Sequence, residues 1–72
     1  MIELDLTGLN CPLPVLKTKK FLATQVSGAM VKIATTDPAS IIDLQDFCNK
    51  AGHKLIEQTT FNGIITTVIE HR

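Results

Sequence analysis

The sequence predicts an α+β domain, a two-layer sandwich of order βαβαββ in which a mixed four-stranded sheet carries two helices on one face. Four segments alternate apolar and polar residues, as strands do, and two segments between them repeat apolar residues at helical spacing. Right-handed crossovers then place both helices on the same side of the sheet. The 72 residues have room for one domain, residues 1–72.

The chain begins with a predicted strand and a predicted helix. In the strand, apolar residues alternate with acidic ones, and the apolar residues are Ile2, Leu4 and Leu6. The helix is expected from about Pro12 to Gln25, because proline fits the first helical position and Gly28 follows soon after. Its predicted apolar stripe is Val15, Thr18, Leu22 and Val26.

A second strand and helix follow. Alternation predicts the strand from Met30 to Thr35. Asp37 is a favourable N-cap and Pro38 a favourable first residue for a helix that runs to Ala51 and stops at Gly52. Its predicted apolar face is Ile41, Leu44, Phe47, Cys48 and Ala51.

The chain closes with a predicted hairpin. Strands are expected at 54–60 and 64–70, joined by Phe61-Asn62-Gly63, because Asn-Gly between two alternating segments is a strong hairpin signal. The last strand is apolar on both faces: Ile65, Thr67 and Ile69 on one, and Ile64, Thr66 and Val68 on the other. The sheet face without helices is therefore a candidate surface for binding a protein.

Composition restricts the classes of function. Seven basic and seven acidic residues cancel, and the chain has no Trp or Tyr, so direct nucleic-acid binding is not expected. No apolar run reaches the roughly 20 residues of a membrane span, and no signal peptide is evident, so we expect a cytoplasmic protein without membrane contact. The two cysteines fit no metal-binding or Cys-x-x-Cys spacing, and both are expected to be free thiols.

Cys11 is the candidate reactive residue, in the segment Leu9-Asn10-Cys11-Pro12-Leu13-Pro14 between the first strand and the first helix. Two prolines remove amide donors from the first helical turn, and the amides of Cys11 and Leu13 are expected to point near the sulfur. Together with the helix dipole they predict a pKa below the usual value of about 8.5. The alternative is that Cys11 is a small buried apolar residue, and local sequence leaves both open.

The other candidate nucleophile and bases have structural explanations. Cys48 falls on the apolar stripe of the second helix, which favours core packing. His53 is a possible base for Cys11, although a solvated histidine stabilised by a helix C-terminus is the favoured interpretation. His71 is expected to be solvated. No histidine pairs with cysteines or carboxylates at metal-ligand spacing, so no metal site is predicted.

Charged residues lie on both helices. Lys17, Lys19 and Lys20 form a modest cationic patch near Cys11. The patch either raises the thiolate content of Cys11, docks an acidic partner or a phosphate, or is ordinary solvated surface. A group on the second helix is expected to be solvated: Asp43, Asp46 and Lys50, the last two at ion-pair spacing. Asp37 is explained as a cap.

The chain resembles the TusA/SirA-like sulfur carrier proteins, small βαβαββ domains with a Cys-Pro-x-Pro motif. The resemblance includes the opening strand, the segment 8–15, the turn Thr36-Asp37-Pro38-Ala39, the pairs Phe47-Cys48 and Gly52-His53, and the final hairpin. It implies that Cys11 accepts a sulfane sulfur as a persulfide from a cysteine desulfurase or rhodanese and passes it to an acceptor protein. No cofactor is implied. The residues that would shape the site are Gly8, Asn10, Pro12, Leu13 and Pro14.

The sequence departs from the family pattern at two motif positions. Members that serve tRNA thiolation commonly have arginine where this chain has Asn10, and Leu13 replaces an acidic residue often found inside the motif. Two rival functions come from other classes: a regulatory module that binds a protein through the open sheet, and a small RNA-binding domain suggested by fold analogy alone. Neutral charge and the lack of a Gly-x-x-Gly loop argue against the second.

Overall fold

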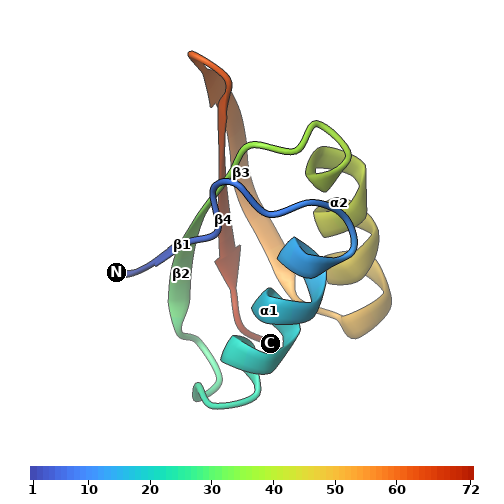
Figure 1. The fold of residues 1–72 in the computed structure, drawn as a ribbon. Helices are drawn as coiled ribbons and strands as arrows, with labels where there is room; N and C mark the ends of the chain where they lie inside the picture. The colour runs from blue at the N-terminus through green and yellow to red at the C-terminus, as the bar shows by residue number, and fades with distance from the viewer.

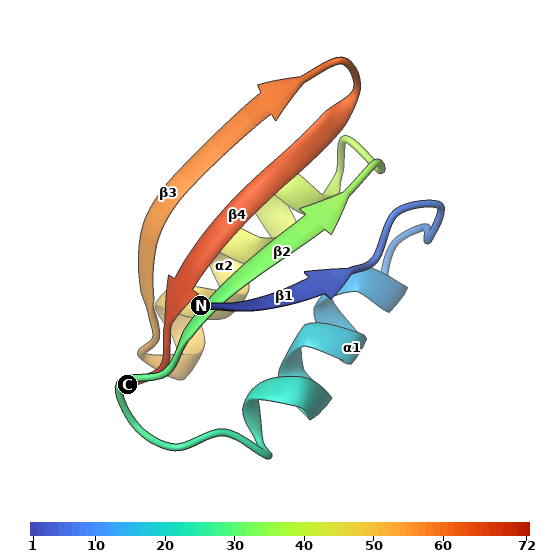
Figure 2. The same ribbon diagram turned by 90° about the vertical axis from the view of Figure 1, so that its left-hand side faces the viewer.

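The computed structural model describes all 72 residues and has the predicted element order (Figure 1). The elements are β1 (Ile2–Asp5), α1 (Leu13–Leu22), β2 (Met30–Thr35), α2 (Ser40–Ala51), β3 (Lys54–Phe61) and β4 (Ile64–Glu70). The sheet order is β1-β2-β4-β3, with β1 parallel to β2 and the other neighbours antiparallel. Figures 1 and 2 show both helices on one face of the sheet and the other face uncovered, as predicted. Neither helix has the length and apolar content to cross a bilayer.

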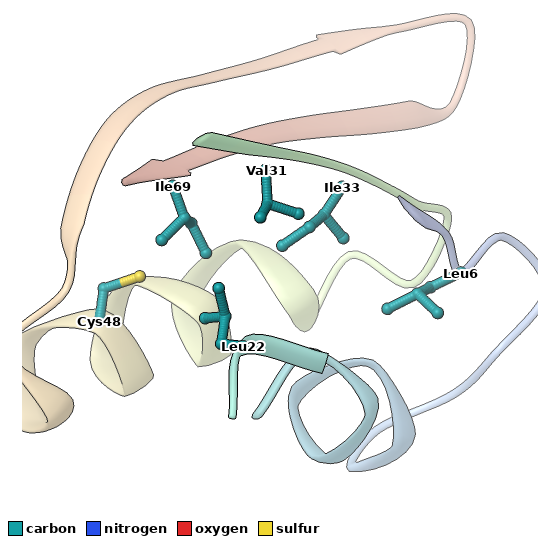
Figure 3. Close-up of a cluster of buried hydrophobic side chains, with 6 residues drawn as sticks. All are labelled: Leu6, Leu22, Val31, Ile33, Cys48 and Ile69. Carbon is teal, nitrogen blue, oxygen red and sulfur yellow. The ribbon is translucent and has the colours of Figure 1, made fainter. Parts of the chain in front are cut away.

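The hydrophobic core fills the space between the sheet and the helices (Figure 3). Its six buried members are Leu6, Leu22, Val31, Ile33, Cys48 and Ile69. They come from five different segments, so their burial joins both ends of the chain to both helices. Each large aliphatic side chain that is fully buried contributes on the order of 1.5–3 kcal/mol.

The final hairpin closes through a two-residue turn. Asn62 and Gly63 both have positive φ, at 51° and 78°, as a type I′ turn requires. Phe61 therefore belongs to β3, one residue beyond the predicted end of that strand. The register of β3 against β4 shifts between Leu55 and Glu57, which leaves Ile56 as an extra, exposed residue.

The first helix is shorter than predicted at both ends. Pro12 is the N-cap and Leu13 the first helical residue, so proline does not occupy the first helical position. The helix ends at Leu22, because the Thr24 hydroxyl and amide both donate to the Phe21 carbonyl and close a turn. The prediction that Val26 lies on the buried stripe is wrong: its side chain is 76% exposed.

The second helix begins two residues later than predicted. Pro38 and Ala39 form a turn ahead of it, and the Asp37 carboxylate accepts the Ala39 amide at 3.1 Å. Asp37 therefore caps this turn, while Ala39 is the N-cap of the regular helix. The predicted end is confirmed, because Gly52 has a left-handed conformation directly after Ala51.

Candidate functional site

The site lies where two loops meet at the carboxyl end of the parallel pair β1 and β2. Parallel neighbours end at the same edge of a sheet, so the chain leaving β1 runs beside the chain leaving β2. Two hydrogen bonds join these loops. The Gly8 amide donates to the Thr36 hydroxyl at 2.8 Å, and the Cys11 amide donates to the Asp37 carboxylate at 2.7 Å. These bonds fix Cys11, an exposed free thiol, just before the start of α1.

The amides expected to stabilise the Cys11 sulfur are used elsewhere. The Cys11 amide is bound by Asp37, and the Leu13 amide donates to the Asn10 carbonyl at 2.9 Å. The prediction that both point near the sulfur is therefore wrong. The prediction considered only α1 as a neighbour of the Cys11 loop. The β2–α2 loop is a second neighbour, and its Asp37 carboxylate accepts the Cys11 amide.

The predicted direction of the Cys11 pKa is also wrong. A hydrogen bond with the Asp43 side chain raises the pKa of the Cys11 thiol above its ordinary value, and desolvation and the charges of Asp43 and Asp37 act in the same direction. Both carboxylates disfavour a thiolate beside them. The surroundings of Cys11 therefore favour its thiol form over the thiolate.

Asp37 has a second role that the sequence did not reveal. Its carboxylate accepts one amide from each of two segments, that of Cys11 and that of Ala39. These hydrogen bonds lower the pKa of Asp37, the one from Cys11 most. The sequence did contain an indication of this role. Asp37 lies in the loop that follows a strand parallel to β1, and this position places it beside Cys11.

A groove between the exposed sides of α1 and α2 runs away from Cys11. It has a volume of about 530 Å³ and its lining is half apolar. The apolar side chains include Leu16, which is 48% exposed, and the half-buried Val15 and Phe47. An exposed sulfur at one end of a partly apolar groove is accessible to a segment of another protein.

Four charged residues also line this groove: Lys19, Asp43, Asp46 and Lys50. Asp46 and Lys50 form the predicted ion pair at 3.0 Å, both well exposed. The prediction that Asp43 is only solvated is wrong, because its side chain is half-buried and lines the groove together with Cys11. Of the predicted lysine patch, only Lys19 lines the groove, and Lys17 and Lys20 are exposed outside it.

Cys48 lies in the core, as predicted. Its side chain is 2% exposed and its sulfur points into the buried cluster (Figure 3). Burial raises the pKa of the Cys48 thiol to about 11. Cys48 is therefore neither accessible nor ionised at neutral pH.

The two histidines lie together, away from Cys11. The His53 ring packs against Phe47 and His71, with ring centroids 5.5 and 4.8 Å apart, and its Nδ1 accepts the Arg72 amide. Burial, with the charges of His71 and Arg72, lowers the pKa of His53. Since His53 follows the last residue of α2 and Asp43 lies in its first turn, His53 is at the wrong end to be a base for Cys11.

The prediction that the two histidines are solvated is also wrong. His53 and His71 are both half-buried, and the His71 Nδ1 lies 2.8 Å from the Arg72 carbonyl oxygen. No cluster of three or more His, Cys, Asp or Glu side chains with metal-binding geometry is found in the structure.

Comparisons with known proteins agree on one family. The sequence model of the family described as Sulfurtransferase TusA matches residues 2–71. The sulfur carrier protein TusA of Allochromatium vinosum is 43% identical over 61 residues, 85% of this chain and 80% of that protein. TusA of Pseudomonas putida is 42% identical over 55 residues, 76% of this chain and 69% of that protein. The crystal structure of the SirA-like protein from Desulfitobacterium hafniense superposes with a TM-score of 0.84 and 32% identity, over 97% of this chain and 96% of that chain.

Proposed function

The chain belongs to the TusA sulfurtransferase family, and we propose that it relays sulfur as a persulfide on Cys11 from a donor enzyme to an acceptor protein. Relatives named as sulfur carriers support the carrier role, and the structure supports the assignment of Cys11 to it. The observation that carries the proposal is the contrast between the two thiols. Cys11 is exposed at the end of a groove, and Cys48 is buried in the core.

The proposed relay has two displacement steps. The Cys11 thiolate attacks the terminal sulfur of the donor persulfide, the donor S–S bond breaks, and the donor cysteine leaves as a thiolate. Cys11 then holds the transferred sulfur. An acceptor thiolate attacks that terminal sulfur, and Cys11 leaves as a thiolate. The Cys11 proton passes to water, no oxidant is consumed, and the chain needs no cofactor.

The donor in this proposal is a cysteine desulfurase or a rhodanese, and the acceptor is another protein rather than a nucleic acid. Asn10 and Leu13 replace the arginine and acidic residue of the tRNA-thiolation pattern, and both side chains are exposed beside Cys11. These two residues do not indicate which sulfur-containing product the acceptor goes on to make. Free thiols on the carrier suit the reducing cytoplasm.

A second candidate function rests on the uncovered sheet face. Phe61 and Ile64 pair with each other next to the β3–β4 turn and are 77% and 43% exposed. Exposed apolar side chains of this size are a possible contact for a protein. In that case Cys11 has no part in the activity, and its alkylation leaves binding intact.

The test combines loading and release. The protein is incubated with a cysteine desulfurase and radiolabelled cysteine, separated from the enzyme, and examined for label that a reductant removes as sulfide. Wild type and Cys48→Ala should each gain one removable sulfur, and Cys11→Ser should gain none. Label on Cys11→Ser would assign the sulfur to Cys48 and contradict the proposal. No label on wild type, with desulfurase and with rhodanese, would favour the second candidate function.

A further inference from the structure

The acidic residues around Cys11 do not have equal roles. Asp37 is occupied by two backbone amides, and Asp46 is paired with Lys50 at 3.0 Å. Asp43 has neither an amide nor a cation as partner, and it lies in the same groove as the thiol. Its carboxylate is therefore the one in this groove whose charge remains unpaired next to the sulfur.

We propose that Asp43 is a selectivity residue for Cys11: its unpaired charge in the groove disfavours a thiolate in the free protein and favours partners with positive charge beside the reacting sulfur. The inference rests on the proposed function, because it concerns the sulfur that the relay uses. It adds the chemical class of the partner, a cationic surface around a persulfide or thiol.

The geometry of the two helices supports this role. The Cys11–Asp37 hydrogen bond ties the cysteine to the loop that leads into α2, and Asp43 is in the first turn of that helix. A rigid element thus carries the carboxylate in the groove that Cys11 also lines. The interaction between the two side chains raises the pKa of Cys11, with Asp37 adding a weaker effect of the same sign.

The proposed release follows from charge. A cation that enters the groove beside Asp43 pairs with the carboxylate. The negative charge that opposed ionisation is then neutralised, and the Cys11 proton passes to water. The same carboxylate repels an anionic reagent. Of the other charged groups that face Cys11, Lys19 acts against this repulsion, and Asp46 and Lys50 cancel in large part.

Small disulfides test the selectivity without any protein partner. Reaction of Cys11 with cystamine, a cationic disulfide, is compared with its reaction with neutral hydroxyethyl disulfide, by peptide mass analysis. Cys11 and Cys48 fall on separate tryptic peptides, residues 1–17 and 33–50, so each thiol is measured by itself. A unit charge near the sulfur predicts a ratio of cationic to neutral rates about fivefold higher in wild type than in Asp43→Asn.

A pH profile tests the effect of the Asp43 charge on the ionisation of Cys11. The rate of Cys11 alkylation by iodoacetamide should reach its midpoint at a lower pH in Asp43→Asn than in wild type. Asp46→Asn is the matched control: it makes the same charge change three residues along the same helix, at a carboxylate already paired with Lys50, and should shift the midpoint less than Asp43→Asn does. Asp43→Glu, which keeps the charge, should retain the preference for cystamine.

An unchanged midpoint and an unchanged rate ratio in Asp43→Asn would overturn the proposal, as would an equal shift in Asp46→Asn. Thermal unfolding of each variant shows that it is folded before rates are compared. If Asp43→Asn fails to fold, Asp43→Ser gives the same comparison. These reactions need no sulfur donor, so their failure is distinct from a failure of sulfur loading on Cys11.

Discussion

The two cysteines of this chain lie in contrasting environments. Cys11 is exposed in a loop held by hydrogen bonds to a neighbouring loop, and Cys48 is packed among aliphatic side chains on α2. Both have a raised pKa, but the causes differ: the Asp43 interaction comes first for Cys11, and burial for Cys48. A partner with a positive charge can cancel the effect of the Asp43 charge on the Cys11 pKa. The effect of burial on the Cys48 pKa is removed only when the protein unfolds. The comparison leaves Cys11 as the thiol that another protein can reach.

The largest expected effect is in reactivity. In native protein, alkylation of Cys48 should be slower than that of Cys11 by roughly a thousandfold or more, because Cys48 reacts only after opening of the core. In denaturant the two rates should converge. Peptide mass analysis of timed samples measures both rates together. A fast native reaction at Cys48 would break the comparison.

A second effect concerns stability. Cys48→Ala removes a buried sulfur and should lower the free energy of unfolding by about 1–2 kcal/mol, measured by urea denaturation. Sulfur loading on Cys11 should be unchanged, because Cys48 does not line the groove. A fully stable variant that no longer loads sulfur would instead assign Cys48 to the site.

Alkaline pH sharpens the comparison further. The unfolded thiol ionises at its ordinary pKa, but folded Cys48 stays protonated until its pKa of about 11. Above the unfolded pKa the folded state therefore binds more protons, so stability falls as pH rises through this interval. Urea denaturation at several alkaline pH values should show a smaller fall in Cys48→Ala than in wild type. Equal falls would mean that Cys48 is not protected from ionisation.

The smallest expected effect is at acid pH, where the Cys11 loop depends on Asp37. Its pKa is lowered by the amides of Cys11 and Ala39, so its stabilising effect is present above its unfolded pKa and is lost as pH falls through the folded value. The amide proton shift of Cys11, followed by NMR, should titrate below the usual aspartate range. In Asp37→Asn this titration should disappear. A titration at the ordinary aspartate pKa would contradict the hydrogen bond.

The elements that the sequence predicted well are those defined by burial. The bounds of β2 and β4 agree with the prediction, because apolar residues recur along the whole of each segment. Buried residues alternate along β2, whereas Val68 of β4 is buried between two buried neighbours. The core position of Cys48 followed from helical spacing for the same reason. The end of α1 was not predicted correctly. The Thr24 side chain competes with the helical hydrogen bonds, and the periodicity of apolar residues does not show this competition.

The environment of Cys11 required contacts distant in the sequence. Its place before a helix was predicted from the motif, and the family resemblance is confirmed. The local sequence left its exposure open, and the structure shows it exposed. The direction of the Cys11 pKa shift was predicted wrongly, because the local argument included the helix dipole and omitted Asp37 and Asp43. These two residues belong to the next crossover. Only the parallel pairing of β1 and β2 brings these carboxylates to the sulfur.

The most direct test of the central claim is to locate the sulfur atom. Wild-type protein is loaded by a cysteine desulfurase with cysteine, its thiols and persulfides are trapped by alkylation, and the tryptic peptides 1–17 and 33–50 are weighed. We predict one added sulfur on the peptide that contains Cys11 and none on the peptide that contains Cys48. Added sulfur on the Cys48 peptide, with the Cys11 peptide unmodified, would contradict the account.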